Sequence, residues 1–256
     1  MKFDELDSQM RVYETANDRC VPPDIHIVAR IDGRGFTKLT KEREKFDAPF
    51  DIRFRDMMVA TVEHLMNCGF RVVYGYTQSD EISLLFHVDD RSFGRKTRKW
   101  DSILAGEASA KFSLLLGALG AFDCRICELP SVKRVVDYFR WRNEDAARNA
   151  LNAHCYWFLR RNGASAEDAT ESTRGMSIEQ KNQMLWEGGI NFNDLPAWQK
   201  RGVGLYWSEV EHEGIDPRDG SKTVVMRRKI IRDFELPLGE EYSQFMWRLL
   251  SDRSDS

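Results

Sequence analysis

Six strand-like and helix-like segments follow one another between residues 25 and 130 in an order that few folds accommodate. Apolar, β-branched runs predict strands, and apolar residues at helical spacing predict helices. On these patterns we expect strands at 25–31, 70–76, 81–88 and 124–129 and helices at 51–67 and 97–119. The β-α-β-β-α-β order is that of a ferredoxin-like α+β fold, in which the first and third strands are neighbours in mid-sheet.

The remaining residues predict helices followed by a long β-hairpin. Ser131 and Ser177 stand where helix N-caps are expected. Two strand-like runs, at 203–210 and 223–231, flank a turn-rich segment at 214–220. We therefore expect a first domain at residues 1–130 and a helical and β-hairpin extension at residues 131–256 packed on it.

The overall charge limits how this chain can meet its partners. With 38 Lys+Arg against 41 Asp+Glu the net charge is -3, so a nucleic acid must be held by local patches. No apolar run approaches the roughly 18 residues of a membrane helix. The first ten residues are acidic, whereas a signal peptide would be basic and apolar. We expect a cytoplasmic protein with no membrane partner.

The five cysteines favour free thiols, because their number is odd and most lie in apolar stretches. Cys124 and Cys127 have the spacing of half a zinc site. No second such pair and no paired histidines follow them, and a structural zinc usually needs four ligands. We therefore do not assign a metal to these thiols.

The predicted topology brings two aspartates together. The first strand ends at Asp32 and the third begins after Asp80, and in an antiparallel arrangement these two ends share one edge of the sheet. Adjacent carboxylates are costly unless a cation neutralises them, and oxygen ligands suit Mg²⁺ that also holds substrate phosphates. Glu81 follows Asp80 on a strand, so we expect its side chain on the opposite face and do not make it a ligand.

Each aspartate taken alone has a plainer explanation. Asp, Gly and Ser are the usual turn residues, so Asp32 and Asp80 could each simply belong to a turn. Their convergence favours a metal-nucleotide site, in which Gly33 and Gly35 let the backbone approach a ligand closely. Two metal ions there would stabilise an in-line phosphoryl displacement.

Three basic segments are candidates for binding anions. Residues 91–99 hold five basic residues at the start of a predicted helix, where cations oppose the helix dipole, so we expect an anion there rather than a solvated face. Residues 133–142 interleave cations with aromatic residues, and residues 227–232 are also basic. Either stretch could follow an RNA backbone, or its aromatics could be core and its arginines paired with acids.

Two motifs carry a resemblance to a known family. Residues 30–36 (RIDGRGF) and 75–83 (GYTQSDEIS) resemble the two metal motifs of the tRNA-His guanylyltransferase family, and the similarity covers most of residues 20–207. It implies a palm like that of template-dependent polymerases, which adds nucleotides to the 5′ end of tRNA in the 3′-to-5′ direction. The family implies Mg²⁺ as two ions, ATP or GTP as the activating nucleotide, a nucleoside triphosphate as substrate, and a homo-oligomer that is a tetramer.

The resemblance also implies roles for individual residues. Asp32 and Asp80 would be catalytic and would bind the metal ions together with the Gly33 carbonyl. The nucleotide would be held by Asp32, Gly33, Arg34, Gly35, Phe36, Thr37, Ser79, Asp80, Lys96 and Lys99. The tRNA would be contacted by Lys133, Arg134, Arg142, Asn149, Lys181, Asn182 and Arg201.

Two departures from the family pattern affect the expected function. Residues 147–150 (ARNA) replace the His-Ile-Asn-Asn motif of the eukaryotic enzymes. This resembles the guanylyltransferase-like branch, which is associated with templated repair of 5′-truncated tRNA. Alternatives are the enzyme that adds the extra guanosine of tRNA-His, a catalytically idle tRNA-binding protein, and a palm-type nucleotide cyclase. Ala48 stands where family members often place a lysine for the triphosphate, and Lys45 is the candidate substitute.

Overall fold

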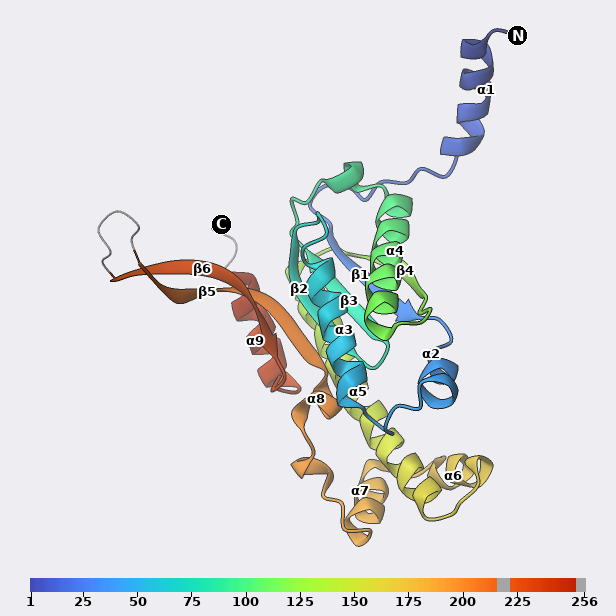
Figure 1. Cartoon of the computed structure of the whole chain (residues 1–256), viewed down its shortest axis with the longest axis vertical. Coiled ribbons are helices and arrows are strands. Elements are labelled where there is room, and N and C mark those ends of the chain that lie inside the picture. Colours follow the sequence, from blue (N-terminus) through green and yellow to red (C-terminus); the bar gives the residue numbers. More distant parts are fainter. Residues whose placement is uncertain (216–221, 252–256) are drawn as a thin grey trace.

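The computed structural model describes residues 1–215 and 222–251, and it is built around one antiparallel sheet (Figure 1). The spatial order of the strands is β4-β1-β3-β2-β5-β6. The strands are β1 (His26–Gly33), β2 (Val72–Gln78), β3 (Glu81–Phe86), β4 (Phe122–Leu129), β5 (Val203–Ile215) and β6 (Lys222–Asp233). The long helices are α1 (Phe3–Thr15), α3 (Ile52–Leu65), α4 (Thr97–Leu116), α5 (Val132–Arg161) and α9 (Glu240–Ser251).

Shorter helices complete the described chain. They are α2 (Phe36–Lys38), the π-helical turn η1 (Leu39–Arg43), η2 (Ser92–Arg95), α6 (Ala166–Thr173), α7 (Ile178–Glu187), η3 (Phe192–Asp194) and α8 (Ala197–Arg201). Within the described ranges no helix is both long and apolar enough to cross a membrane.

The first half of the chain has the predicted β-α-β-β-α-β order, from β1 through α3, β2, β3 and α4 to β4. Its four strands pair as β4-β1-β3-β2, which confirms the ferredoxin-like α+β fold. The caps predicted at the later helices are also confirmed. The Ser131 hydroxyl accepts a hydrogen bond from the Arg134 N–H, and Ser177 forms a capping box with Gln180.

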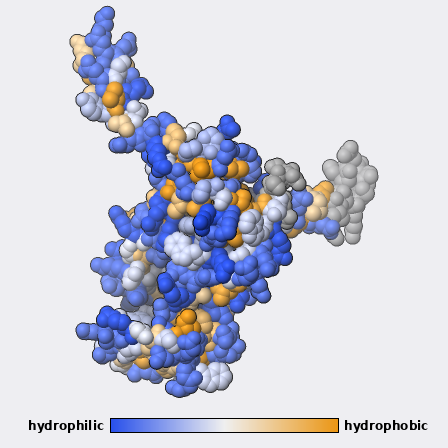
Figure 2. All heavy atoms as spheres, turned by 180° about the vertical axis from the view of Figure 1, so that it is seen from behind, coloured by the Kyte–Doolittle hydropathy of each residue, from blue (hydrophilic) through white to orange (hydrophobic). Residues whose placement is uncertain are grey.

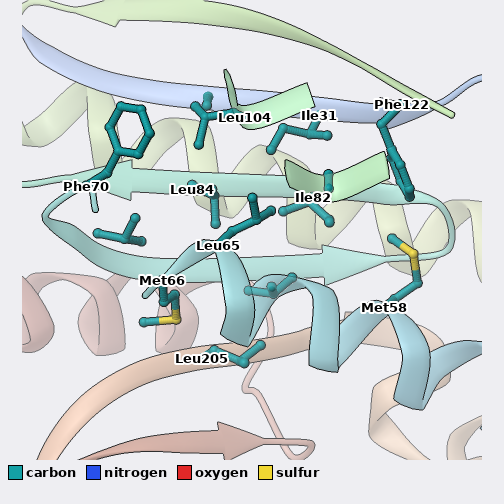
Figure 3. Packing of buried hydrophobic residues seen from close by; sticks show 14 of the residues in the cluster. Ile31, Met58, Leu65, Met66, Phe70, Ile82, Leu84, Leu104, Phe122 and Leu205 are labelled. Atoms are coloured by element: carbon teal, nitrogen blue, oxygen red, sulfur yellow. The ribbon is translucent and has the colours of Figure 1, made fainter. Parts of the chain in front are cut away.

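Each face of the sheet is covered by its own apolar layer. Helices α3 and α4 cover one face, where Leu65 and Leu104 pack against Ile31 and Ile82 of the middle strands (Figure 3). Helices α5 and α9 cover the other face, together with alternate residues of the same strands. Because a strand directs successive side chains to opposite faces, the sheet needs both layers, which is why its central strands are almost continuously apolar.

The second half of the chain extends the sheet of the first. Strand β5 pairs with β2 from Thr77 to Tyr74, and β6 pairs with β5 along its whole described length. On the α5 face, the buried hydroxyls of Tyr74 and Tyr242 lie 2.9 Å apart and share a hydrogen bond. The predicted hairpin is therefore confirmed, although residues 216–221 of its expected turn lie outside the described residues.

Helix α1 was not predicted from the sequence. It stands clear of the body, as Figure 2 shows, and none of its residues is buried. The segment that follows it is tied to the start of α4, because Asp18 pairs with both Lys96 and Arg98. Because α1 packs against no other element, its sequence needs no apolar stripe from which a helix could be predicted.

Candidate active site at the β1–β3 edge

Strand register brings Asp32 and Asp80 to one edge of the sheet. Strands β1 and β3 are antiparallel, and Asp32 lies opposite Glu81 in the ladder. One residue further on, the Gly33 N–H donates to the Asp80 carbonyl oxygen at 3.0 Å. The side-by-side arrangement that the sequence predicted for these residues is therefore present in the fold.

The pKa values of both carboxyl groups are raised. Burial, and after it the charge of Asp32, raises the pKa of Asp80 to about 6. Burial and the charge of Glu81 also raise the pKa of Asp32, and Arg30 opposes this shift. The hydroxyl of Ser79 is the one side-chain group within the described residues that is recorded donating to Asp80, at 3.2 Å. Two partly buried carboxylates with so few donors form a site that favours a cation.

The residues at this edge fit a magnesium ion better than a transition metal. Within the described part of the chain no group of three or more His, Cys, Asp or Glu side chains is placed to hold a metal. Two carboxylates and a backbone carbonyl are hard oxygen donors, and Mg²⁺ commonly keeps its other positions for water and phosphate. Asp32, Asp80 and the Gly33 carbonyl are therefore the residues that would hold it.

Replacing Asp80 by Asn should stabilise the metal-free protein at neutral pH. The pKa of Asp80 is about 6 in the folded protein, whereas an unperturbed aspartate has a pKa of 3.8. Folding therefore opposes ionisation of this group, and the protein loses stability as the pH rises from about 4 to about 6. The Asn variant should gain roughly 1–3 kcal/mol at pH 8 in EDTA and almost nothing at pH 4. Urea unfolding at the two pH values measures this difference, and an equal change at both would contradict the assignment.

Glu81 belongs to an ion-pair network rather than to the carboxylate pair. Its carboxylate pairs with Arg30 of β1 and with Arg142 of α5, and Arg142 also pairs with Asp145 at 3.3 Å. The contact with Arg142 places the Glu81 carboxylate on the α5 face of the sheet. Glu81 lies directly opposite Asp32, and cross-strand partners share one face, which is why its charge acts on Asp32. Arg142 is 6% exposed, so it ties α5 to the β1–β3 edge and offers little surface to an RNA.

In the glycine-rich turn after Asp32, Gly35 and the Phe36 ring shape and anchor the turn. Gly35 has a φ of 74°, a left-handed conformation that glycine adopts without strain. The Phe36 ring is buried, and its centroid lies 4.8 Å from that of Phe122. Arg34 and Thr37 are exposed. Phe36 can therefore contact a nucleotide only through its backbone, whereas Arg34 and Thr37 can also do so through their side chains.

A cavity of about 110 Å³ opens beside Ser79. Its wall combines Thr77–Ser79 with residues of the loop before α3 and with Trp157 of α5 and Trp198 of α8. The sequence did not predict these two tryptophans as site residues. No local pattern could have indicated them, because the wall is assembled from segments far apart in the chain.

The structure also shows which cations line this cavity. Ala48 is part of the wall, and its carbonyl oxygen accepts a hydrogen bond from Arg161. Lys45 is not among the lining residues, whereas Lys41 and Arg55 are. Lys41 is therefore better placed than Lys45 to replace the lysine expected at position 48.

Lys96 and Lys99 lie far from the carboxylate pair of their own chain. Strand β3 runs away from Asp80 for about 20 Å before α4 begins. At that far edge Lys96 pairs with Asp18 at 2.7 Å, and Lys99 is exposed. The structure does not bring these two lysines to the edge where Asp32 and Asp80 meet within one chain.

The tRNA candidates on α5 are largely engaged. Lys133 and Arg134 are exposed but share the carboxylate of Asp137, at 3.2 and 3.1 Å. The Asn149 amide donates to Asp145 at 3.2 Å. Exposed ion pairs are weak, so Lys133 and Arg134 remain available to a polyanion, whereas Asn149 helps to fix its own helix.

Of the other tRNA candidates, Asn182 and Arg201 bind backbone carbonyls of the chain itself, whereas Lys181 has no ionic partner among the described residues. The Asn182 amide donates to the Ile178 carbonyl of its own helix at 2.9 Å. Arg201 donates to the Leu236 carbonyl at 3.0 Å and so ties α8 to the segment after β6. The half-buried Lys181 makes no ion pair with any described residue.

Cys124 and Cys127 are separated by an odd number of positions on β4. Cys124 packs against the layer of α3 and α4, and Cys127 against the layer of α5 and α9. The two thiols point to opposite faces of the sheet and cannot bind one ion together. All five cysteines are free thiols.

Comparisons with known proteins identify the family. The sequence profile described as tRNAHis guanylyltransferase matches residues 7–130, and the profile described as Thg1 C terminal domain matches residues 133–235. The chain belongs to the tRNAHis guanylyltransferase family. Membership in this family makes it a nucleotidyltransferase and confirms the resemblance found in the metal motifs.

Individual relatives support this assignment to the tRNAHis guanylyltransferase family. The tRNA(His) guanylyltransferase of Debaryomyces hansenii is 30% identical over 84% of this chain and 88% of its own length. That of Schizosaccharomyces pombe is 30% identical over 82% of this chain and 83% of its own. A bacterial tRNA(HIS) guanylyltransferase (Thg1)-like protein in complex with ATP superposes with a TM-score of 0.73 at 27% identity, covering 94% of this chain and 99% of that one. The palm-like fold is thereby confirmed.

Proposed function

We propose that this protein adds a nucleotide to the 5′ end of tRNA in the 3′-to-5′ direction, with Mg²⁺ as its metal. The observation that carries the proposal is the convergence of Asp32 and Asp80 at one sheet edge, beside a cavity that reaches Ser79. A pure RNA-binding module would gain nothing from two neighbouring, partly buried carboxyl groups whose pKa values are both raised. This argues against the catalytically idle alternative.

Each group at the edge has a role in the proposal. Asp32, Asp80 and the Gly33 carbonyl hold Mg²⁺, which when bound neutralises phosphate charge and supports in-line displacement. The backbone of the turn at residues 33–37 and the Ser79 hydroxyl bind the nucleoside triphosphate. The bacterial relatives were solved with ATP and with GTP, which supports a purine nucleotide in this cavity. Lys96 and Lys99 would reach these phosphates only from a second copy of the chain, as in the expected homo-oligomer.

Two versions of the reaction follow from the family and the sequence. The relatives bear the name tRNA(His) guanylyltransferase, so the comparisons favour addition of the extra guanosine more directly than templated repair. Repair is supported by a different observation. Arg148 and Asn149, in the segment that replaces His-Ile-Asn-Asn, both bind Asp145 of their own helix and are not directed to a substrate.

Changing the base opposite the missing nucleotide should separate the two versions. On a tRNA lacking one 5′ nucleotide, templated repair predicts that replacing the facing C by A switches addition from G to U. The preference should be about a hundredfold, because a mispaired base misplaces the attacking 3′-OH. Primer extension with each labelled nucleoside triphosphate measures it. Guanosine addition whatever the opposite base, confined to tRNA with the histidine anticodon, would support guanylylation instead.

The same assay tests the enzyme itself. The control is the intact tRNA, which offers no unpaired position and should receive no nucleotide under repair. If neither nucleotide incorporation nor transfer of AMP or GMP to the 5′-monophosphate occurs on any substrate, the proposed function is overturned. The idle tRNA-binding protein would then be the better description.

A further inference from the structure

A second hollow lies next to the nucleotide cavity, where α5 meets η1, α6 and α7. We call it the basic hollow and define it by Lys41, Asn152, Tyr156, Trp157, Arg174 and Lys181. None of the residues that line it is an aspartate or glutamate. This is unusual for a chain whose acidic residues outnumber its basic ones. A concave surface lined by cations without carboxylates concentrates anions.

The cations of the hollow have fewer carboxylate partners than Arg140 of α5 has. Lys41 and Lys181 form no ion pair with any residue that the structure describes. The Lys41 ammonium is held 5.5 Å from the ring centroids of both Tyr156 and Trp157. Arg174 pairs with Glu171 at 2.7 Å, but both side chains are largely exposed, so the pair is weak. By contrast, Arg140 pairs with Glu144 and Glu240.

The hollow is continuous with the site already described. Lys41 and Trp157 line both the basic hollow and the cavity that reaches Ser79. No residue of the carboxylate edge lines the hollow itself. Arg174 and Lys181 line the hollow but not the nucleotide cavity, so phosphates bound at these two side chains are not those of a nucleotide held at Asp32 and Asp80. They belong to a ligand that continues past the cavity and carries several phosphates.

We propose that the basic hollow binds backbone phosphates of the RNA strand whose end reaches Asp32 and Asp80. The inference rests on the proposed function, since it takes RNA as the substrate. A groove lined by cations can follow an RNA backbone, and the half-buried Tyr156 and Trp157 beside them can stack on bases. Asn152 adds an amide that can bind a ribose or phosphate oxygen.

Removing two cations from the hollow should weaken RNA binding and leave nucleotide binding intact. The variant is Arg174→Gln with Lys181→Gln, because neither residue lines the nucleotide cavity. Filter binding of a tRNA transcript, without nucleotide, should show about tenfold lower affinity at 0.1 M salt. The slope of log K against log salt should become shallower by about 1.4–1.8. The Kd for ATP should stay within twofold.

A matched control removes the same charge at the other end of the molecule. The control is Lys2→Gln, at the N-cap of α1, with Arg11→Gln on α1, which Figure 1 places far from α6 and α7. This control should keep the wild-type affinity and salt slope. Because Lys181 is half-buried, Arg174→Gln alone serves as a second variant and should produce about half the change in slope. Thermal unfolding establishes that each variant is folded.

Three results would overturn the proposal: unchanged RNA affinity and slope in the double variant, an equal loss in the α1 control, or a fall in ATP affinity in place of RNA affinity. A wild-type protein that does not bind the transcript at all would overturn it too. If the wild-type protein binds the transcript but never adds a nucleotide, the proposed function is overturned and the proposed RNA-binding role is not. In that case the basic hollow would stand as an RNA-binding site.

Discussion

Asp32→Asn and Asp80→Asn should each lower kcat/KM for nucleotide addition by about a thousandfold or more. Each change keeps the size of the side chain but removes one of the two charges that would hold the metal at the β1–β3 edge. The metal's stabilisation of phosphate charge is worth several kcal/mol, and 1.36 kcal/mol is tenfold in rate. Single-turnover addition of a labelled nucleotide to a 5′-truncated tRNA measures the loss.

Asp101→Asn is the matched control for this experiment. Asp101 lies on α4, and burial raises its pKa as it does that of Asp80, but it is not at the carboxylate edge. Its substitution should leave nucleotide addition unchanged. Near-normal turnover of Asp32→Asn or Asp80→Asn with Mg²⁺ would mean that the two-carboxylate site is wrong.

Gly33→Ala should lower activity by about a hundredfold, although it adds only a methyl group. A Cβ at Gly33 would lie 2.6 Å from a ring carbon of Phe36 and 2.9 Å from the Cβ of Asp80. The Phe36 ring is buried against Phe112 and Phe122, so it cannot retreat without disturbing the core. Asp80 must therefore shift, and a misplacement of about 1 Å can cost a hundredfold in rate.

The same substitution should cost roughly 1–3 kcal/mol of stability, as overpacking of a core usually does. Urea unfolding and the single-turnover assay measure the two effects separately. Gly106→Ala is the control, because Gly106 is exposed on α4 and its Cβ would meet nothing within 4 Å. That variant should gain roughly 0.5–1 kcal/mol. An active Gly33→Ala enzyme would show that the turn at residue 33 does not position Asp80.

The position of the carboxylates could be predicted because it depends only on strand order. Once β1 and β3 are antiparallel neighbours, the end of one and the beginning of the other must share an edge. The same reasoning separates Lys96 from Asp80, because β3 has to cross the sheet before α4 begins. The resemblance alone assigns both residues to one nucleotide, and it carries no information about the distance between them in one chain.

The cavity wall could not have been predicted from the sequence. Trp157 and Trp198 come from two helices of the second half, and each looks like an ordinary core residue in its own segment. Arg142 shows the same limit in the opposite direction. Among the cations and aromatics of residues 133–142 it resembles an RNA contact, yet it is buried against Glu81. Long-range packing decides such cases, and local pattern does not record it.

The pairing of β2 with β5 has a consequence for the synthesis of this chain. Strand β2 ends at Gln78, but the strand that covers its outer edge begins only at Val203. The ribosome makes the intervening stretch of roughly 125 residues at about 5–20 residues per second, which takes on the order of 6–25 s. During that interval the nascent palm exposes an apolar strand edge with unpaired backbone groups, the kind of edge that aggregates. Productive folding of this protein therefore depends on protecting that edge until the second half emerges.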